Sequence, residues 1–182
     1  MKCQLSEKTI QETIRFHGHS CPGLAIGIRA AEYALHEFKD TAEEDLLCVT
    51  ETDMCGVDGI QFLTGCTFGK GNLVHLDYGK AAFSFYDRKS GKAFRLLLRP
   101  EAKQGNNREQ LEREELQRML MEKSLTELFD CVSITEKPPR KARVLASIQC
   151  EECREDTMES RTRRFAGKTL CIPCFNDVEQ KV

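Results

Sequence analysis

Four cysteines near the C-terminus are spaced as ligands of a single metal ion. Cys150 and Cys153 form one CxxC pair, and after seventeen intervening residues Cys171 and Cys174 form a second. A CxxC turn directs two thiolates at one ion, and zinc is commonly held by four thiolates in a tetrahedron. A segment with so little apolar content needs a metal in order to fold. The pattern therefore predicts a structural zinc site, in preference to redox-active CxxC pairs or free thiols.

A second group of metal-binding residue types lies in the segment 16–23 (FHGHSCPG). His17 and His19 offer neutral imidazole nitrogens, and Cys21 offers a thiol. Pro22 suits the first position of a helix, which makes Cys21 the N-cap residue, where the helix dipole lowers the pKa of a thiol. We therefore expect a metal or catalytic site at these three residues. The alternative is a loop with two surface histidines and a capping cysteine.

Two more cysteines, Cys55 and Cys66, bracket a short helix and lead into a glycine-rich loop. Each could reach the His/Cys segment as a ligand, or could simply be a small buried residue. The loop is not a Walker A motif, which has four residues between its glycines and a Ser or Thr after the lysine. Lys70 could hold an anionic ligand, with a solvated lysine as the alternative.

The other histidines and cysteines have simpler explanations. His75 and Asp77 alternate onto one face of a strand, as they would on the polar outer face of a sheet. The rest are expected to be structural or incidental: His36, Cys3, Cys48 and Cys131.

The elements that must position these residues follow from hydrophobic periodicity and capping signals. Helices are expected after Ser6, from Pro22, over 57–65, over 107–123 with Asn107 as cap and Gln110 three residues later, from Ser124 with Glu127, and over 175–182. Strands are expected over 46–52, 72–78, 81–87 and 93–99, with Gly79-Lys80 as a type II′ turn between the second and third, and a hairpin over 161–168 with Gly167 in its turn. Helices followed by an antiparallel meander and more helices indicate an α+β domain. The C-terminal segment has the order of a treble-clef finger: a CxxC turn at Cys150 and Cys153, then the hairpin, then a helix that starts at the second CxxC pair.

Length and charge indicate two parts. A chain of 182 residues with 40% apolar side chains forms one domain, or one domain with a small module. Two prolines at 138 and 139 mark a junction, and charge changes there, since 137–182 carries a net +3 and the first 136 residues a net −5. We therefore divide the chain into an α+β core, 1–137, and a treble-clef zinc finger, 138–182.

Composition also limits the environment and the partners. No apolar run is long enough to span a membrane, and the first ten residues lack a signal-peptide pattern. Ten cysteines without an export signal favour a reducing cytoplasm. The overall charge of −2 excludes bulk attraction to nucleic acid, and the basic tail has interleaved acidic residues, so nucleic acid is not an expected partner.

Three long motifs resemble the FmdE family, named for the E component of molybdenum or tungsten formylmethanofuran dehydrogenase. They are FHGHSCPGLAIGIRAA, CGVDGIQFLTGCTFGKGN and the paired CxxC tail. The resemblance implies an α+β core, often dimeric, with a treble-clef finger in some members. It matches His17, His19 and Cys21 to the first motif and Cys55, Gln61, Cys66 and Lys70 to the second. These residues would form the core site around a metal ion.

The resemblance places the chain beside the reduction of carbon dioxide to a formyl group on methanofuran, the entry step of methanogenesis. It does not make this chain the catalyst, because we find no pterin-binding signature and the six non-finger cysteines do not form an iron–sulfur run. The leading hypothesis is a metal-binding accessory protein, homodimeric and associated with dehydrogenase subunits or with cofactor maturation. Its finger holds structural zinc. Its core holds a second metal of unidentified element through His19, Cys21, Cys55 and Cys66. This site has an open coordination position, and His17 acts as a further ligand or as a proton shuttle.

Two alternatives stay open. The chain could be a self-sufficient metalloenzyme that uses Cys21 as ligand or nucleophile and His17 or His19 as general acid or base. It could instead be a zinc-finger adaptor or regulator whose core senses a small molecule. A core metal with an open coordination position favours the enzyme, and four protein ligands disfavour it.

Overall fold

The structure, a computed structural model, describes residues 2–104 and 112–178. The chain folds into two compact units, Met1–Lys141 and Ala142–Val182, which we call the core unit and the finger unit. The division lies four residues beyond the one expected from the sequence, because residues 138–141 contact the core unit. Arg88 donates a hydrogen bond to the carbonyl of Pro139, and Lys141 lies 3.7 Å from the Asp45 carboxylate. No helix within the described ranges has the length and apolarity to cross a membrane.

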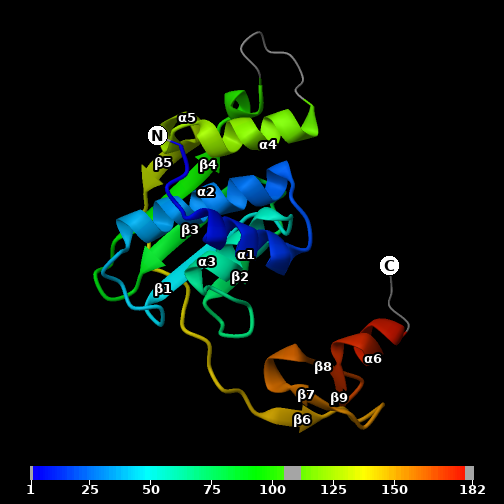
Figure 1. Cartoon of the computed structure of the whole chain (residues 1–182). Helices are drawn as coiled ribbons and strands as arrows, with labels where there is room; N and C mark the ends of the chain where they lie inside the picture. The colour runs from blue at the N-terminus through cyan, green and yellow to red at the C-terminus, as the bar shows by residue number, and fades with distance from the viewer. Residues whose placement is uncertain (1, 105–111, 179–182) are drawn as a thin grey trace. The chain divides into compact units, whose positions relative to one another are not determined.

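The core unit has the expected α+β composition (Figure 1). Its elements in chain order are α1 (Glu7–His17), α2 (Pro22–Glu37), β1 (Leu46–Thr50), α3 (Gly56–Thr64), β2 (Leu73–His75), β3 (Ala82–Asp87), β4 (Ala93–Leu98), the 3-10 helix η1 (Pro100–Lys103), α4 (Arg113–Glu122), α5 (Leu125–Leu128) and β5 (Phe129–Ser133). The strands form one sheet in the order β2-β1-β3-β4-β5. Every neighbouring pair is antiparallel except β1 and β2, which are parallel.

Helix α2 is the centre of the core unit, lying over the strands in Figure 1. Residues on nearly all of its sides are buried, because it packs on the sheet and also contacts α1, α3 and α4. At its C-terminal end, the ring of Phe38 stacks on Phe94 of β4 with centroids 5.1 Å apart. The small residues that the sequence places on α2 allow α3 to approach closely. A Cβ atom at Gly27 would lie only 2.0 Å from the carbonyl oxygen of Gly56.

The expected hairpin around Gly79-Lys80 is wrong. β2 pairs with β1 in parallel, and β1 lies between β2 and β3 in the sheet. The chain from β2 to β3 therefore passes the end of β1, where Lys80 donates its backbone N–H to the carbonyl of Glu51. All five residues of β1 are buried, and a central position in the sheet satisfies the hydrogen bonds on both of its edges. Gly79 has a positive φ of 64°, as a turn glycine does, but it lies where the chain passes the end of β1 and not in a hairpin turn.

Most helix starts agree with their capping signals. Ser6 caps α1, Cys21 caps α2, and Ser124 with Glu127 forms a complete capping box at α5. The helix expected over 107–123 is described only as α4 from Arg113, because its expected cap Asn107 and Gln110 lie outside the described residues. Strand β5 was not expected from the sequence.

The finger unit is built from short elements around the second cysteine group. They are β6 (Ser147–Gln149), β7 (Asp156–Met158), the 3-10 helix η2 (Glu159–Arg161), β8 (Thr162–Phe165), β9 (Lys168–Cys171) and α6 (Ile172–Asp177). The expected hairpin around Gly167 is confirmed as β8–β9. The helix starts at the second CxxC pair, three residues earlier than the expected range 175–182, of which 179–182 lie outside the described residues. β6 and β7, which flank the first CxxC pair, were not expected.

Candidate metal centre

The three ligand types in the first motif come together because α1 ends where α2 begins. His17 is the last residue of α1, and Gly18 ends that helix in the left-handed conformation with φ of 93°, which glycine adopts without steric cost. The following turn carries His19. Cys21 then caps α2, and its sulfur accepts the backbone N–H of Leu24 at 3.3 Å. The two helix ends thus hold two imidazoles and one thiol at a single corner of the core unit.

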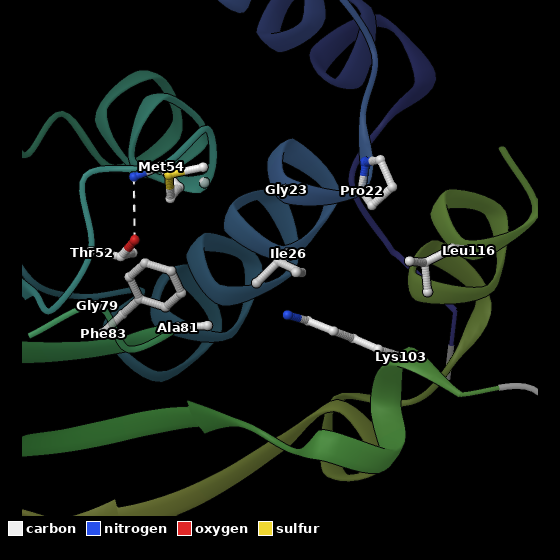
Figure 2. Close-up of a pocket in the computed structure, with 11 residues that line it drawn as sticks. Pro22, Gly23, Ile26, Thr52, Met54, Gly79, Ala81, Phe83, Lys103 and Leu116 are labelled. Atoms are coloured by element: carbon white, nitrogen blue, oxygen red, sulfur yellow. Dashed lines mark hydrogen bonds between the residues drawn. The ribbon is translucent and has the colours of Figure 1, made fainter. Parts of the chain in front are cut away.

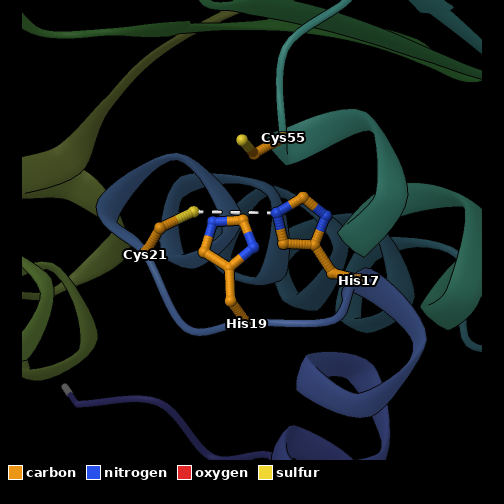
Figure 3. A group of neighbouring side chains, drawn as sticks. All are labelled: His17, His19, Cys21 and Cys55. Atoms are coloured by element: carbon orange, nitrogen blue, oxygen red, sulfur yellow. Dashed lines mark hydrogen bonds between the residues drawn. The ribbon is translucent and has the colours of Figure 1, made fainter.

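The fourth member, Cys55, comes from the start of α3. Its position depends on the close packing of α3 against α2, since a Cβ at Gly23 would lie 3.1 Å from the Cβ of Cys55. Figure 3 shows His17, His19, Cys21 and Cys55 directed toward a common point. One ligand atom from each residue lies within 4.8 Å of all the others. We call these four residues the core ligand group.

The separations within the core ligand group suit a tetrahedral metal site. The Sγ atom of Cys21 lies 3.8 Å from Nε2 of His17, and the His17 and His19 ring centroids lie 4.5 Å apart. Zinc bonds of about 2.3 Å to sulfur and about 2.0 Å to nitrogen put neighbouring ligands roughly 3.5 Å apart in a tetrahedron. Two thiols and two imidazoles therefore fit zinc or a similar transition metal in both chemistry and spacing.

A carboxylate behind His17 fixes the orientation of its ring. Nδ1 of His17 lies 2.7 Å from Oδ2 of Asp58, and Gln61 donates to the other carboxylate oxygen at 3.4 Å. Because an ionised carboxylate only accepts hydrogen bonds, Nδ1 carries the proton and Nε2 presents its lone pair toward Cys21. This carboxylate–histidine arrangement is typical of metal-ligating histidines.

The thiols of the group favour a cation between them. Burial raises the pKa of the Cys55 thiol, and its proximity to the Cys21 sulfur raises it further. Two adjacent thiols resist ionising together unless a positive charge offsets their repulsion. A bound metal ion supplies that charge, because metal coordination deprotonates thiols. Cys21 is 3% exposed, so this sulfur is also protected from solvent.

Three of the residues assigned from the second motif lie outside the core ligand group. Gln61 donates a hydrogen bond to Asp58, and Asp58 in turn contacts His17. Cys66 is fully buried in the hydrophobic core, where its sulfur lies 3.7 Å from the Leu46 carbonyl and burial raises its thiol pKa. Lys70 forms an ion pair with Glu43. Cys66, expected as a candidate metal ligand, and Lys70, expected to hold an anionic ligand, thus lie outside the core ligand group.

Asp58 is the functional residue that sequence reasoning missed. It is 41 positions from His17 in the chain, and no spacing rule relates the two. The sequence places Asp58 in the first turn of a helix that begins after Cys55. Acidic residues are common in first turns because they interact favourably with the helix dipole, so this position alone does not indicate a metal site.

A cavity of about 360 Å³ adjoins the core ligand group (Figure 2). Pro22, Gly23 and Gly56 line it, and they follow Cys21 and Cys55 directly in the chain. A Cβ at Gly23 would lie 3.9 Å from the Cys21 sulfur and 3.7 Å from that of Cys55. Gly23 therefore lies beside both thiols and also lines the cavity.

The finger unit contains the second complete ligand group. Cys150, Cys153, Cys171 and Cys174 place their sulfur atoms within 4.8 Å of one another. The backbone N–H of Cys171 donates to the sulfur of Cys150 and lowers the pKa of that thiol to about 6. The neighbouring Cys171 thiol, followed by burial, raises the pKa of Cys174 to about 12. The Cys150 thiolate forms readily, whereas the raised pKa of Cys174 means that its thiolate needs a nearby cation, which suits a zinc site with four thiolates.

Two families match the chain, one for each unit. Residues 16–130 match FmdE, described as "Molybdenum formylmethanofuran dehydrogenase operon". Residues 145–180 match the prokaryotic dksA/traR C4-type zinc finger.

A curated relative and a solved structure show what the chain is similar to. A probable S-adenosyl-L-methionine-binding protein from Archaeoglobus fulgidus is 30% identical over 187 residues, which take in 87% of this chain and 50% of the relative. The chain thus spans about half the length of that relative. The crystal structure of a protein from Syntrophus aciditrophicus, described as similar to FmdE of tungsten formylmethanofuran dehydrogenase, is 27% identical, with a TM-score of 0.73 and coverage of 94% of this chain and 93% of the other.

Proposed function

The chain belongs to the FmdE family, and from that premise we propose that it is a metal-binding accessory protein of one-carbon metabolism. Its core unit binds one transition-metal ion through the core ligand group, and its finger unit binds structural zinc. It assists the conversion of carbon dioxide and formyl groups, or the maturation of a cofactor used there. The observation that carries the proposal is the convergence of two imidazoles and two thiols from α1, α2 and α3.

The number of ligands favours binding or delivery of the metal over catalysis. Two imidazoles and two thiolates complete a tetrahedron, so no position is left for a water or substrate. His19 is the exposed member of the group, whereas Cys21 is buried. Exchange of the metal would therefore begin at His19, which can leave the site toward solvent without disturbing α1, α2 or α3.

A metalloenzyme is the second candidate, and the cavity beside the core ligand group favours it. When bound, the metal would supply Lewis acidity or an activated water if His19 withdrew. His17, held by Asp58, would orient its Nε2 at the site. The name of the Archaeoglobus fulgidus relative adds S-adenosyl-L-methionine as a molecule to test in this cavity.

The cellular setting of the proposal is a reducing cytoplasm, where both cysteine groups stay reduced and able to bind metal. We propose a homodimer that works beside formylmethanofuran dehydrogenase subunits, as the family resemblance implies. The remaining alternative is an adaptor or regulator that binds nucleic acid through the finger unit. Salt-dependent DNA binding by the full chain would support it, and its absence at low salt would remove it.

Elemental analysis of protein purified without oxygen tests the core site. The native chain is expected to contain two metal equivalents, one of them zinc. Cys21→Ser should lose only the core equivalent, and Cys153→Ser only the zinc of the finger unit. Cys66→Ser is a matched control, because Cys66 lies outside the core ligand group, and it should keep both equivalents. Full metal content in Cys21→Ser would refute the core site.

Co-purification then tests the partner. The tagged chain from a host that expresses formylmethanofuran dehydrogenase should retain its subunits, and Cys21→Ser should retain fewer if the metal takes part. A chain that retains none of them and leaves dehydrogenase activity unchanged when deleted would refute the accessory role.

A further inference from the structure

The cavity of the core unit has a chemical character that neither the metal site nor the family match assigns. We propose that it binds a small organic acid, with one carboxylate group and a largely apolar body. The proposal does not rest on metal binding, because the residues that define it lie outside the core ligand group.

The walls of the cavity are mainly apolar. Side chains of Ile26 from α2, Ala81 and Phe83 from the segment entering β3, and Leu116 from α4 line it. Figure 2 shows Ile26 between Phe83 and Ala81 on one side and Leu116 on the other. The volume of about 360 Å³ lies near the lower end of the roughly 300–1,000 Å³ range of small-molecule sites. The cavity therefore suits a compact hydrocarbon or aromatic body.

One charged group borders this apolar space, and its residue is exposed to solvent. Lys103, the last residue of η1, extends its side chain into the cavity toward Ile26 (Figure 2). Its ammonium forms no ion pair with any residue in the described ranges, whereas Lys70 and Lys92 each pair with a glutamate. Among the described residues that line the cavity, Lys103 is the only ionisable one. An anion of the ligand would replace solvent beside this exposed ammonium.

The surroundings favour a single carboxylate over a phosphate or an amino acid. Proteins hold phosphate through several donors, such as arginines or the N–H groups of a glycine-rich loop, and Lys103 is one point charge. Thr52 is the only hydroxyl among the described lining residues; it accepts the N–H of Met54 at 3.3 Å and has one O–H left to donate, fewer donors than a phosphate needs. An amino acid would also need an acidic partner for its ammonium group, and the described lining offers none.

Two glycines of the cavity wall lie beside the core ligand group. Gly23 and Gly56 line the cavity with backbone atoms, and both thiols lie within van der Waals reach of a Cβ built at Gly23. A ligand whose carboxylate pairs with Lys103 would place its apolar body among the side chains of Ile26, Phe83 and Leu116.

Binding of 4-phenylbutyrate and of its uncharged amide to the full chain tests the proposal. Isothermal titration gives the affinities, and methyl NMR signals of Ile26 and Leu116 locate the ligand. We expect the acid to bind about tenfold more tightly than the amide, as for a hydrogen bond to a charged group. Lys103→Met should remove this preference, while weak binding of the amide persists.

Lys80→Met is the matched control. Lys80 lies between the lining residues Gly79 and Ala81 but does not itself line the cavity, and its ammonium lies 5.9 Å from the ring centroid of Tyr78. Equal loss of acid binding in both lysine variants would mean general electrostatic attraction and overturn the proposal. So would an acid preference that survives Lys103→Met, or tighter binding of S-adenosyl-L-methionine than of the acid. Repeating the titration with Cys21→Ser separates the two proposals, because acid binding should persist there without core metal.

Discussion

The substitution Gly27→Ala tests whether the close approach of α2 and α3 holds the core ligand group together. A Cβ at residue 27 would lie 2.0 Å from the carbonyl oxygen and 2.5 Å from the Cα of Gly56. A carbon in ordinary contact with a carbonyl oxygen lies about 3.3 Å away, so α3 would have to move by roughly 1.3 Å. The obstructing atoms are backbone, and no change of side-chain rotamer relieves the clash.

The displacement should affect stability and metal binding together. Overpacking of a core costs about 3 kcal/mol at the upper end, and the better helix propensity of alanine offsets about 1 kcal/mol of this. The free energy of unfolding should therefore fall by about 2 kcal/mol. Cys55 precedes Gly56, so it would move away from Cys21 by a similar distance, whereas metal–ligand distances tolerate only about 0.2 Å. The core metal should be lost and the zinc of the finger unit kept.

Urea unfolding followed by helical circular dichroism, together with metal analysis, measures both effects. Gly69→Ala is the matched control, since no atom lies within 4 Å of its Cβ position, and it should behave as the native chain does. Gly59→Ala should be intermediate, because its Cβ would lie 3.0 Å from the backbone nitrogen of Ile28. If Gly27→Ala keeps its core metal and unfolds within about 0.5 kcal/mol of the native chain, the packing argument is wrong.

Three further predictions concern separate parts of the molecule. Asp58→Asn should weaken core metal binding by about 10- to 100-fold, measured by competition with a chromophoric chelator, because His17 loses its orienting carboxylate. The hydrogen bonds from Arg95 hold the pKa of Glu51 below its ordinary 4.5, so their stabilisation is complete above that pH and disappears as pH falls through the folded-state pKa. The difference in unfolding free energy between the native chain and Arg95→Met should therefore shrink below pH 4.5; a constant difference would contradict this. Chelation of zinc should unfold the finger unit while the core unit stays folded, measured as hydrogen exchange faster in 142–178 than in 2–104.

Local signals in the sequence predicted the helices better than the sheet. The cap at Ser6, the start of α2 after Cys21 and the capping box at Ser124 depend on neighbouring residues, and all three are confirmed. The pairing of β2 with β1 depends on which strands bury most surface in the centre of the sheet, and no local signal specifies it. Gly79 suggested a hairpin because its positive φ suits a II′ turn, yet the same φ serves a crossing between non-adjacent strands.

The candidate sites differ in the same way. The finger unit could be predicted because its four ligands lie on two short CxxC turns, each with fixed spacing. The sequence suggested both Cys55 and Cys66 for the core, and it could not choose between them. They lie at opposite ends of α3, a helix of nine residues, and only the end that packs against Gly23 approaches Cys21. The choice is thus made by helix packing.

The two cysteine groups differ in charge, and this difference bears on the apolar cavity beside the core group. Zinc with four thiolates carries a net charge of −2, which needs N–H donors or solvent around it, and the finger supplies a donor at Cys150. A divalent metal with two thiolates and two neutral imidazoles has no net charge. Such a site costs little to bury, so apolar walls can lie directly beside Cys21 and Cys55. An organic acid held by Lys103 would then meet a neutral metal site and feel no repulsion from it.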